Sequence, residues 1–231
     1  MVHAIQFSPK RVGSTFLQKA IDSHPDIMGI DEVFVNIAKK PGARKSGFVP
    51  FIRSDIREAG EYIREVIYKT YPDKSTIFKL MYNQITFHSG LIRFIKENDV
   101  PIIHLMRRNI VKQIISGLTA ATTKHTPIPI SPEQLYLLVK EADDLNNHWA
   151  EKLKKYIKLS LYYEDIIGET INDRTYVSED INNEICNLFK VKHNKLFATT
   201  KKKNKDDISV YLPNIGSIKE YFEETKYGWM I

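Results

Sequence analysis

Residues 5–17, with the sequence IQFSPKRVGSTFL, decide the fold of this chain. Their first part is a short apolar run with β propensity, Ser8 and Pro9 end that run, and from Ser14 onward apolar residues recur with helical spacing. This order predicts a strand, a tight loop and a helix. The N–H groups of the first turn of such a helix point at one place, where the helix dipole adds partial positive charge. The sequence therefore predicts an anion-binding loop.

The same stretch keeps part of the P-loop pattern G-x-x-x-x-G-K-[ST]. Gly13 takes the position of the second glycine and Thr15 that of the hydroxyl residue, but Ser8 replaces the first glycine and Ser14 replaces the lysine. The loop keeps its anion cradle and lacks the lysine that binds a nucleoside triphosphate; its basic residues precede the glycine instead. A turn followed by an ordinary helix N-cap would explain the glycine and the hydroxyls equally well.

Composition limits the class of protein. At 231 residues the chain is long enough for one domain with a sizeable core, and we expect a single domain over residues 1–231. The 34 basic and 28 acidic side chains give a net charge of +6, which suits an anionic ligand and is too small to demand nucleic acid. With one cysteine, Cys186, and no long apolar stretch at the N-terminus, the chain is expected to be cytoplasmic and not membrane-bound.

Apolar patterning divides the rest of the chain into alternating strands and helices. Strands are predicted at 4–7, 27–30, 76–82, 101–106 and 156–163. Helices are predicted from 14, from a cap at Ser54 to the stop at 71–73, and over 90–97, 110–118, 131–153, 178–188 and 215–223, with loops at 39–53 and 119–129. This alternation predicts an α/β fold: a three-layer, P-loop-like domain with a central, mostly parallel β-sheet flanked by helices.

Basic residues mark two of the predicted strands. Lys79 interrupts the apolar strand 76–82, and its ammonium could reach solvent from an edge strand or point into a site at the strand end. The strand 101–106 ends in Arg107 and Arg108, where a P-loop NTPase would usually carry a magnesium-binding acid. Cations are unfavourable at the start of the next helix, so we expect a bound phosphate to offset them. His104, in the same strand, is expected to pack in the core.

Several separate segments resemble the sulfotransferases, which transfer a sulfuryl group from 3'-phosphoadenosine 5'-phosphosulfate (PAPS) to an acceptor. Residues 9–17 resemble the 5'-phosphosulfate loop of that family, and Arg108 with Ser116 is similar to its 3'-phosphate motif. Tyr163, followed by Glu164 and Asp165, resembles a family segment after a late strand, and residues 207–231 resemble the C-terminus of bacterial members.

The resemblance implies a role for each matching residue. It implies that the co-substrate is bound by Arg11, Val12, Gly13, Ser14, Thr15, Phe16, Arg108, Ser116 and Tyr163, with Lys201 and Lys203 as parts of a flap. It implies that Arg11 and Lys79 neutralise charge on the transferred group and that Glu32 is the general base. The implied product is adenosine 3',5'-bisphosphate, the acceptor a small molecule or carbohydrate with a hydroxyl or amine, and no metal is needed.

Two positions depart from the family pattern, and two other functions stay open. Met81 stands where many cytosolic members have a catalytic histidine, and Val12 stands where a serine is common. One alternative function is a P-loop kinase or NTPase, which the absence of the loop lysine disfavours. The other is a non-catalytic module that binds polyanions through its basic residues. Acceptor identity and oligomeric state do not follow from the sequence.

Overall fold

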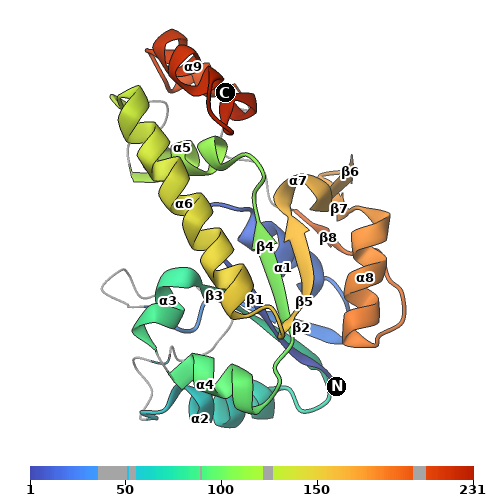
Figure 1. The fold of residues 1–231 in the computed structure, drawn as a ribbon. Helices are drawn as coiled ribbons and strands as arrows, with labels where there is room; N and C mark the ends of the chain where they lie inside the picture. The colour runs from blue at the N-terminus through green and yellow to red at the C-terminus, as the bar shows by residue number, and fades with distance from the viewer. Residues whose placement is uncertain (36–50, 52–55, 89, 122–126, 200–206) are drawn as a thin grey trace.

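The computed structural model describes residues 1–35, 51, 56–88, 90–121, 127–199 and 207–231. Its centre is a five-stranded sheet in the order β2-β3-β1-β4-β5, in which every neighbouring pair is parallel (Figure 1). The strands are β1 (His3–Ser8), β2 (Ile27–Ile30), β3 (Ser75–Met81), β4 (Ile102–Met106) and β5 (Ile157–Tyr162). Because all five run the same way, their carboxyl ends lie at one edge of the sheet.

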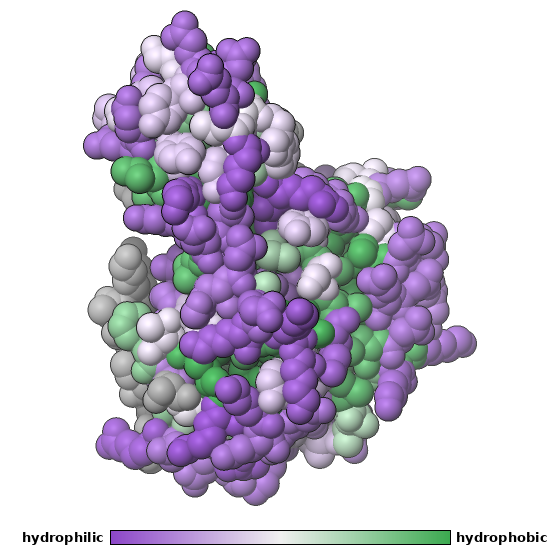
Figure 2. Space-filling view, in the orientation of Figure 1, coloured by the Kyte–Doolittle hydropathy of each residue, from purple (hydrophilic) through white to green (hydrophobic). Residues whose placement is uncertain are grey.

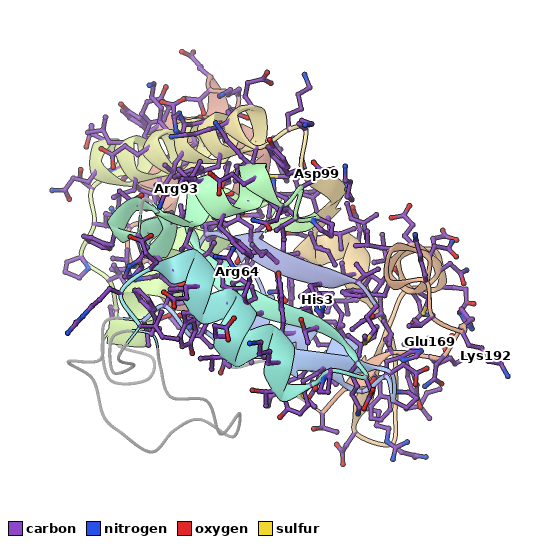
Figure 3. All side chains as sticks on the ribbon, turned by 90° about the horizontal axis from the view of Figure 1, so that it is seen from below. His3, Arg64, Arg93, Asp99, Glu169 and Lys192 are labelled. Atoms are coloured by element: carbon purple, nitrogen blue, oxygen red, sulfur yellow. The ribbon has the colours of Figure 1, made fainter. Side chains whose placement is uncertain are left out.

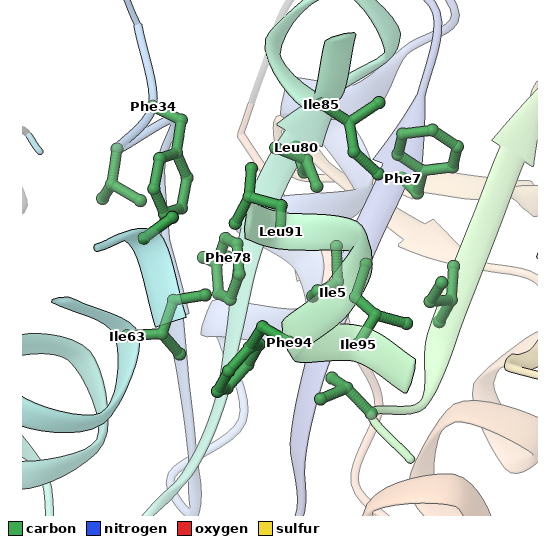
Figure 4. Close-up of a cluster of buried hydrophobic side chains, with 14 of the residues drawn as sticks. Ile5, Phe7, Phe34, Ile63, Phe78, Leu80, Ile85, Leu91, Phe94 and Ile95 are labelled. Carbon is green, nitrogen blue, oxygen red and sulfur yellow. The ribbon is translucent and has the colours of Figure 1, made fainter. Parts of the chain in front are cut away.

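One face of the sheet is covered by helices from the middle of the chain. They are α2 (Ala59–Tyr62), its π-helical continuation η2 (Ile63–Tyr68), α3 (Tyr82–Phe87), α4 (Gly90–Glu97) and the C-terminal part of α6 (Pro132–Lys152). Figure 4 shows Phe78 and Leu80 of the sheet packed against Ile63, Leu91 and Phe94 of these helices. Burial of this large apolar cluster is what holds the layer to the sheet.

The other face of the sheet packs on α1 (Ser14–Asp22) and α8 (Glu179–Phe189). A small antiparallel sheet adjoins them, in the order β6-β7-β8, which the sequence reading missed. Its strands are β6 (Ile167–Ile171), β7 (Arg174–Val177) and β8 (Phe197–Ala198), and the one-turn helix α7 (Tyr163–Ile166) leads into it. The strands have only two to five residues each, too few to form a recognisable alternating apolar pattern.

A third apolar cluster lies beyond the carboxyl edge of the sheet. It joins α5 (Ile110–Ala121), the N-terminal half of α6, α9 (Ile215–Glu223) and the short helices η3 (Ile208–Val210) and η4 (Gly228–Met230). Figure 1 shows α9 at the far end of α6, away from the main sheet. The helix α6 starts at a capping box, in which Ser131 Oγ accepts from the Gln134 amide. This confirms the predicted start of that helix.

The central α/β architecture predicted from the sequence is thus confirmed, whereas two local predictions are wrong and one helix was not predicted. The helix expected from Ser54 begins only at Ala59, since residues 56–58 are not helical; Ser54 itself lies outside the described residues. The sequence reading missed α3, which follows β3 without a loop because Gln84 supplies its cap. Helix α5 runs to Ala121, whereas a loop was expected from residue 119.

The outer surface of the described residues is largely polar. Figure 2 shows hydrophilic residues over most of one face, with hydrophobic ones visible mainly between α6 and α8, where the edge strand β5 lies. Figure 3 shows charged side chains such as Arg93, Asp99 and Lys192 at the periphery. No helix in the described ranges is both long and apolar enough to cross a bilayer. Within the same ranges no cluster of three or more His, Cys, Asp or Glu side chains could hold a metal ion.

Candidate active site

A cavity of about 820 Å³ opens at the carboxyl edge of the central sheet. Five basic side chains (Lys10, Arg11, Lys79, Arg107 and Lys112) and two acidic ones (Glu32 and Glu164) are among the described residues that line it. Its volume lies within the range of small-molecule sites, and its basic lining favours an anionic ligand. Of the residues singled out in the sequence, the cavity is lined by Arg11, Gly13, Ser14, Thr15, Phe16, Glu32, Lys79, Ser116 and Tyr163.

The loop between β1 and α1 has the backbone of an anion cradle. Arg11 has φ 68° and Gly13 has φ 77°, so two residues of the loop adopt the left-handed conformation. Gly13 is the N-cap of α1 and has no side chain to cap the helix, and no acidic residue occupies the first turn of α1. The first N–H groups of α1 therefore face the cavity without a carboxylate from their own helix, which is the condition for binding an external anion.

The ring of Tyr163, as well as the backbone conformation, leaves room only for glycine at position 13. A Cβ atom built on Gly13 would lie 2.2 Å from Cδ2 of Tyr163 and 2.5 Å from its Cε2. The tyrosine ring therefore lies directly against the loop backbone. The close contact joins the first βα unit to α7, which follows the last strand of the central sheet.

Two polar residues that pair with each other on adjacent strands bind the first turn of α1. Gln6 of β1 pairs in register with Lys79 of β3, and both side chains point to the face that carries α1. Gln6 Nε2 donates to the Ser14 carbonyl at 2.8 Å, and Lys79 Nζ donates to Thr15 Oγ1 at 3.3 Å. Both bonds connect the first turn of α1 to the sheet. They therefore fix the end of the loop that precedes α1.

Lys79 does not reach solvent, which settles one question that the sequence left open. Its side chain is 4% exposed, and its Nζ lies 2.9 Å from Asp31 Oδ1 and 3.5 Å from Glu32 Oε1. Burying an ammonium is costly unless a counter-charge accompanies it, and the residues that follow β2 supply two carboxylates. The ammonium thus lies at the cavity wall, between the β1–α1 loop and the end of β2.

One face of α5 forms another part of the cavity wall, next to the loop. Arg11 Nε donates to Ser116 Oγ at 3.1 Å, although the two residues are 105 positions apart. Lys112 lines the cavity one turn before Ser116, since residues four apart share a helix face. The loop of the first βα unit and the helix after β4 therefore meet around one cavity.

Residues at the end of β5 and in α7 bind the side chain of Arg108. Its guanidinium pairs with Asp165 and lies 4.1 Å from the centre of the Tyr162 ring. The carboxylate of Glu164 accepts from the backbone N–H groups of Arg108 and Asn109, at 3.0 and 3.3 Å. The negative charge that we expected a phosphate to bring to this helix start comes from α7 instead. Arg108 is not among the described residues that line the cavity.

The neighbouring Arg107 lines the cavity, whereas the sequence reading placed both arginines at an anion site and assigned the 3'-phosphate to Arg108 alone. Its side chain is 12% exposed, its guanidinium lies 5.2 Å from the centre of the Tyr163 ring, and its Nε is 3.6 Å from Glu164 Oε1. A signal was present: Leu105 packs on the α1 face, and two residues further along a strand the side chain returns to that face. Arg107, and not Arg108, continues that alternation.

The remaining sequence candidates differ in their surroundings. Glu32 is 26% exposed at the cavity wall and accepts from Gln84 Nε2 at 2.9 Å. Met81 also lines the cavity, and its sulfur accepts a hydrogen bond from Ser8 Oγ. Val12 is fully buried in the core beside α1, so it supports the loop from behind. Lys201 and Lys203 lie outside the described residues.

Similarity to known proteins was found among solved structures. No protein-family model matches the sequence, and no curated protein matches it. Among solved structures, the crystal structure of a sulfotransferase from Alicyclobacillus acidocaldarius is similar, with 13% sequence identity and a TM-score of 0.48 over 100% of this chain and 99% of that one. A similarity at this level does not identify the family of the chain, and it is the geometry of the cavity that indicates the kind of ligand.

Proposed function

We propose that this protein is a sulfotransferase that moves a sulfuryl group from PAPS to a hydroxyl or amine of a small-molecule or carbohydrate acceptor. One observation carries the proposal. The loop after β1 and the face of α5 line the same cavity and are joined by the hydrogen bond from Arg11 to Ser116. Two anion-binding segments on one cavity suit a ligand with two separate phosphate groups.

The donor group of each segment suggests which phosphate it binds. The backbone N–H groups of Gly13, Ser14 and Thr15 are candidates for the 5'-phosphate, since they start a helix that has no side-chain cap. Ser116 is the candidate on α5 for the 3'-phosphate, with an arginine from the end of β4. Phe16 and Tyr163 offer aromatic faces at the cavity wall for the adenine.

Either arginine at the end of β4 could complete the 3'-phosphate site. The sequence motif favours Arg108, whose guanidinium would have to leave Asp165 to reach a ligand. Burial at the cavity wall and the contact with Tyr163 favour Arg107. Val12 contributes by packing behind the loop. Lys201 and Lys203 keep the proposed role of a flap over the nucleotide.

The chemistry needs a base and a cation near the sulfur, and β2 and β3 supply candidates for both. In the proposed step the acceptor oxygen or nitrogen bonds to sulfur, the bond from sulfur to the bridging oxygen breaks, and its electron pair leaves on the 5'-phosphate. Glu32 accepts the proton of the acceptor. Lys79 and Arg11 offset the negative charge that develops on the bridging oxygen, which is the largest expected contribution to such transfers.

Binding of adenosine 3',5'-bisphosphate is the first test. Ligand at about 100 times its dissociation constant stabilises a protein by roughly 2.7 kcal/mol, which for a chain of this size raises Tm by roughly 5–11 °C. Radiolabelled PAPS with a panel of hydroxyl and amine acceptors then tests transfer. No shift at saturating nucleotide contradicts the proposal. Magnesium-dependent ATP turnover would point to a kinase or NTPase, and salt-sensitive polyanion binding without a nucleotide shift would point to a binding module.

Matched variants separate binding from chemistry. We expect Glu32→Gln to leave the affinity for adenosine 3',5'-bisphosphate unchanged and to slow transfer. Arg107→Gln should weaken nucleotide binding by about tenfold or more, because a charge-assisted hydrogen bond is worth roughly 1.5–3 kcal/mol. Arg108→Gln is its neighbour-matched control and should weaken binding less. A larger loss of nucleotide affinity in the Arg108 variant would show that Arg108, the arginine of the sequence motif, binds the 3'-phosphate. If Glu32→Gln lost as much nucleotide affinity, Glu32 would not be the base.

A further inference from the structure

The proposed catalytic pair, Lys79 and Glu32, belongs to a continuous chain of hydrogen bonds that includes two residues without an assigned role. At its centre Asp31 Oδ1 accepts from Lys79 Nζ at 2.9 Å and from the backbone N–H of Glu32 at 2.9 Å. One carboxylate oxygen therefore fixes the ammonium of Lys79 and the backbone that carries Glu32. A residue that holds two reacting groups at once controls the distance between them.

The other end of the chain holds the carboxylate of Glu32. Its Oε2 accepts from Gln84 Nε2 at 2.9 Å, and Gln84 Oε1 in turn accepts from the Met81 backbone N–H at 2.9 Å. Gln84 is 5% exposed and lies in the first turn of α3, directly after β3. Its amide cannot rotate without losing a bond to the end of the strand that carries Lys79. Glu32 is thus held from β2 through Asp31 and from β3 through Gln84.

Lys79 connects this chain to the loop, since its Nζ also donates to Thr15 Oγ1 at 3.3 Å. The three acceptors around the ammonium come from α1 and from both residues that follow β2. Without Asp31, Glu32 would be the remaining carboxylate partner of Nζ among the described residues, with its Oε1 now at 3.5 Å. A tighter pair between Lys79 and Glu32 would occupy the base and draw the cation away from the loop.

We infer that Asp31 and Gln84 are positioning residues of the proposed reaction: Asp31 keeps Lys79 next to the loop and apart from Glu32, and Gln84 keeps Glu32 turned toward the acceptor. The inference rests on the proposed function. It accounts for the two acidic residues that follow β2 and lie near the buried ammonium of Lys79. It also explains why α3 starts at the end of β3 with a buried glutamine.

Steady-state kinetics with PAPS and an accepted hydroxyl or amine substrate tests the inference. Asp31→Asn and Gln84→Met should each lower kcat by about tenfold or more, since small displacements of reacting groups have effects of this size. The KM for PAPS and the affinity for adenosine 3',5'-bisphosphate should stay within about twofold, because neither residue lines the cavity wall that holds the nucleotide. An unchanged kcat, or a raised KM with unchanged kcat, overturns the inference.

Two matched controls exclude a general loss of stability. Asp22→Asn removes a carboxylate that accepts from the Gly29 N–H at 2.8 Å, so it also supports β2 but lies away from Lys79. Gln113→Met removes a buried amide from α5, where Gln113 is 6% exposed. Both controls should keep the kcat of the wild type. A fall in kcat for Asp22→Asn equal to that for Asp31→Asn would make the role of Asp31 merely structural.

A measurement without activity separates this inference from the proposed function. In urea unfolding, Asp31→Asn and Lys79→Met should be non-additive, with the double variant more stable than the sum of the two single losses predicts. Additive losses overturn the claim that Asp31 holds Lys79. If the wild type neither binds adenosine 3',5'-bisphosphate nor transfers a sulfuryl group, the proposed function falls together with the catalytic half of this inference, whatever the coupling shows.

Discussion

Replacing Gly13 by alanine should destabilise the protein through two separable causes. Gly13 has φ 77°, a conformation that costs a residue with a Cβ atom about 1–2 kcal/mol. The new Cβ would also lie 2.2 Å from Cδ2 of Tyr163, so the ring must move from its rotamer at a cost of about 0.5–1.5 kcal/mol. Together we expect a loss of about 1.5–3.5 kcal/mol, or a Tm lower by roughly 3–14 °C in a chain of this length.

Urea unfolding followed by circular dichroism measures this loss, and a second glycine provides the control. Gly216 lies in α9 with no atom within 4 Å of a built Cβ, so Gly216→Ala should be neutral or stabilising by up to about 1 kcal/mol. The variant Gly13→Ala should also bind adenosine 3',5'-bisphosphate more weakly, since the loop backbone shifts with the ring.

Adding Tyr163→Ala to Gly13→Ala separates the two causes. The second substitution removes the ring that the Cβ meets, so the step from glycine to alanine should cost only the backbone part, about 1–2 kcal/mol, in that background. Unchanged stability of Gly13→Ala would refute the reasoning altogether. If Gly13→Ala lost the same free energy of unfolding with and without the tyrosine ring, the ring would move at no cost. The need for glycine would then come from the backbone conformation alone.

Three further predictions concern the rest of the chain. Ser131→Ala removes the side-chain cap of α6 and should lower the free energy of unfolding by about 0.5–2 kcal/mol in urea titrations. Burial lowers the pKa of His104, which shares a hydrogen bond with Tyr82, to about 4. The unfolded chain therefore binds a proton between about pH 6.5 and 4 that the folded chain does not, so stability is lost as the pH falls through that window. His104→Leu should flatten this pH dependence by up to about 1.4 kcal/mol per pH unit, and an unchanged slope in pH-dependent unfolding would contradict the assignment. Arg108→Ala should lower Tm by loosening α7, because its guanidinium bonds Asp165 and stacks on Tyr162; a Tm equal to that of the wild type would remove this structural role.

Local patterns were sufficient for the central fold and for part of the site. The run from β1 through Gly13 into α1 is encoded by neighbouring residues, as are the five strands of the central sheet and the capping box at Ser131. Such features depend on side-chain periodicity, turn chemistry and caps, all of which act within a few residues. The sequence left open whether Lys79 points to solvent or into a site, and it placed Ser116 at a site only through the family resemblance.

Tertiary contacts decided the rest. The sequence offers Arg107 and Arg108 side by side, and the choice between cavity and surface was made by α7, whose Asp165 holds Arg108. Likewise, the two acids after β2 become partners of Lys79 only because β2 lies beside β3 in the sheet. Strand order, and which distant side chains meet, are set by the packing of the whole chain. A local sequence pattern does not tell which residues far apart in the sequence lie close together in space.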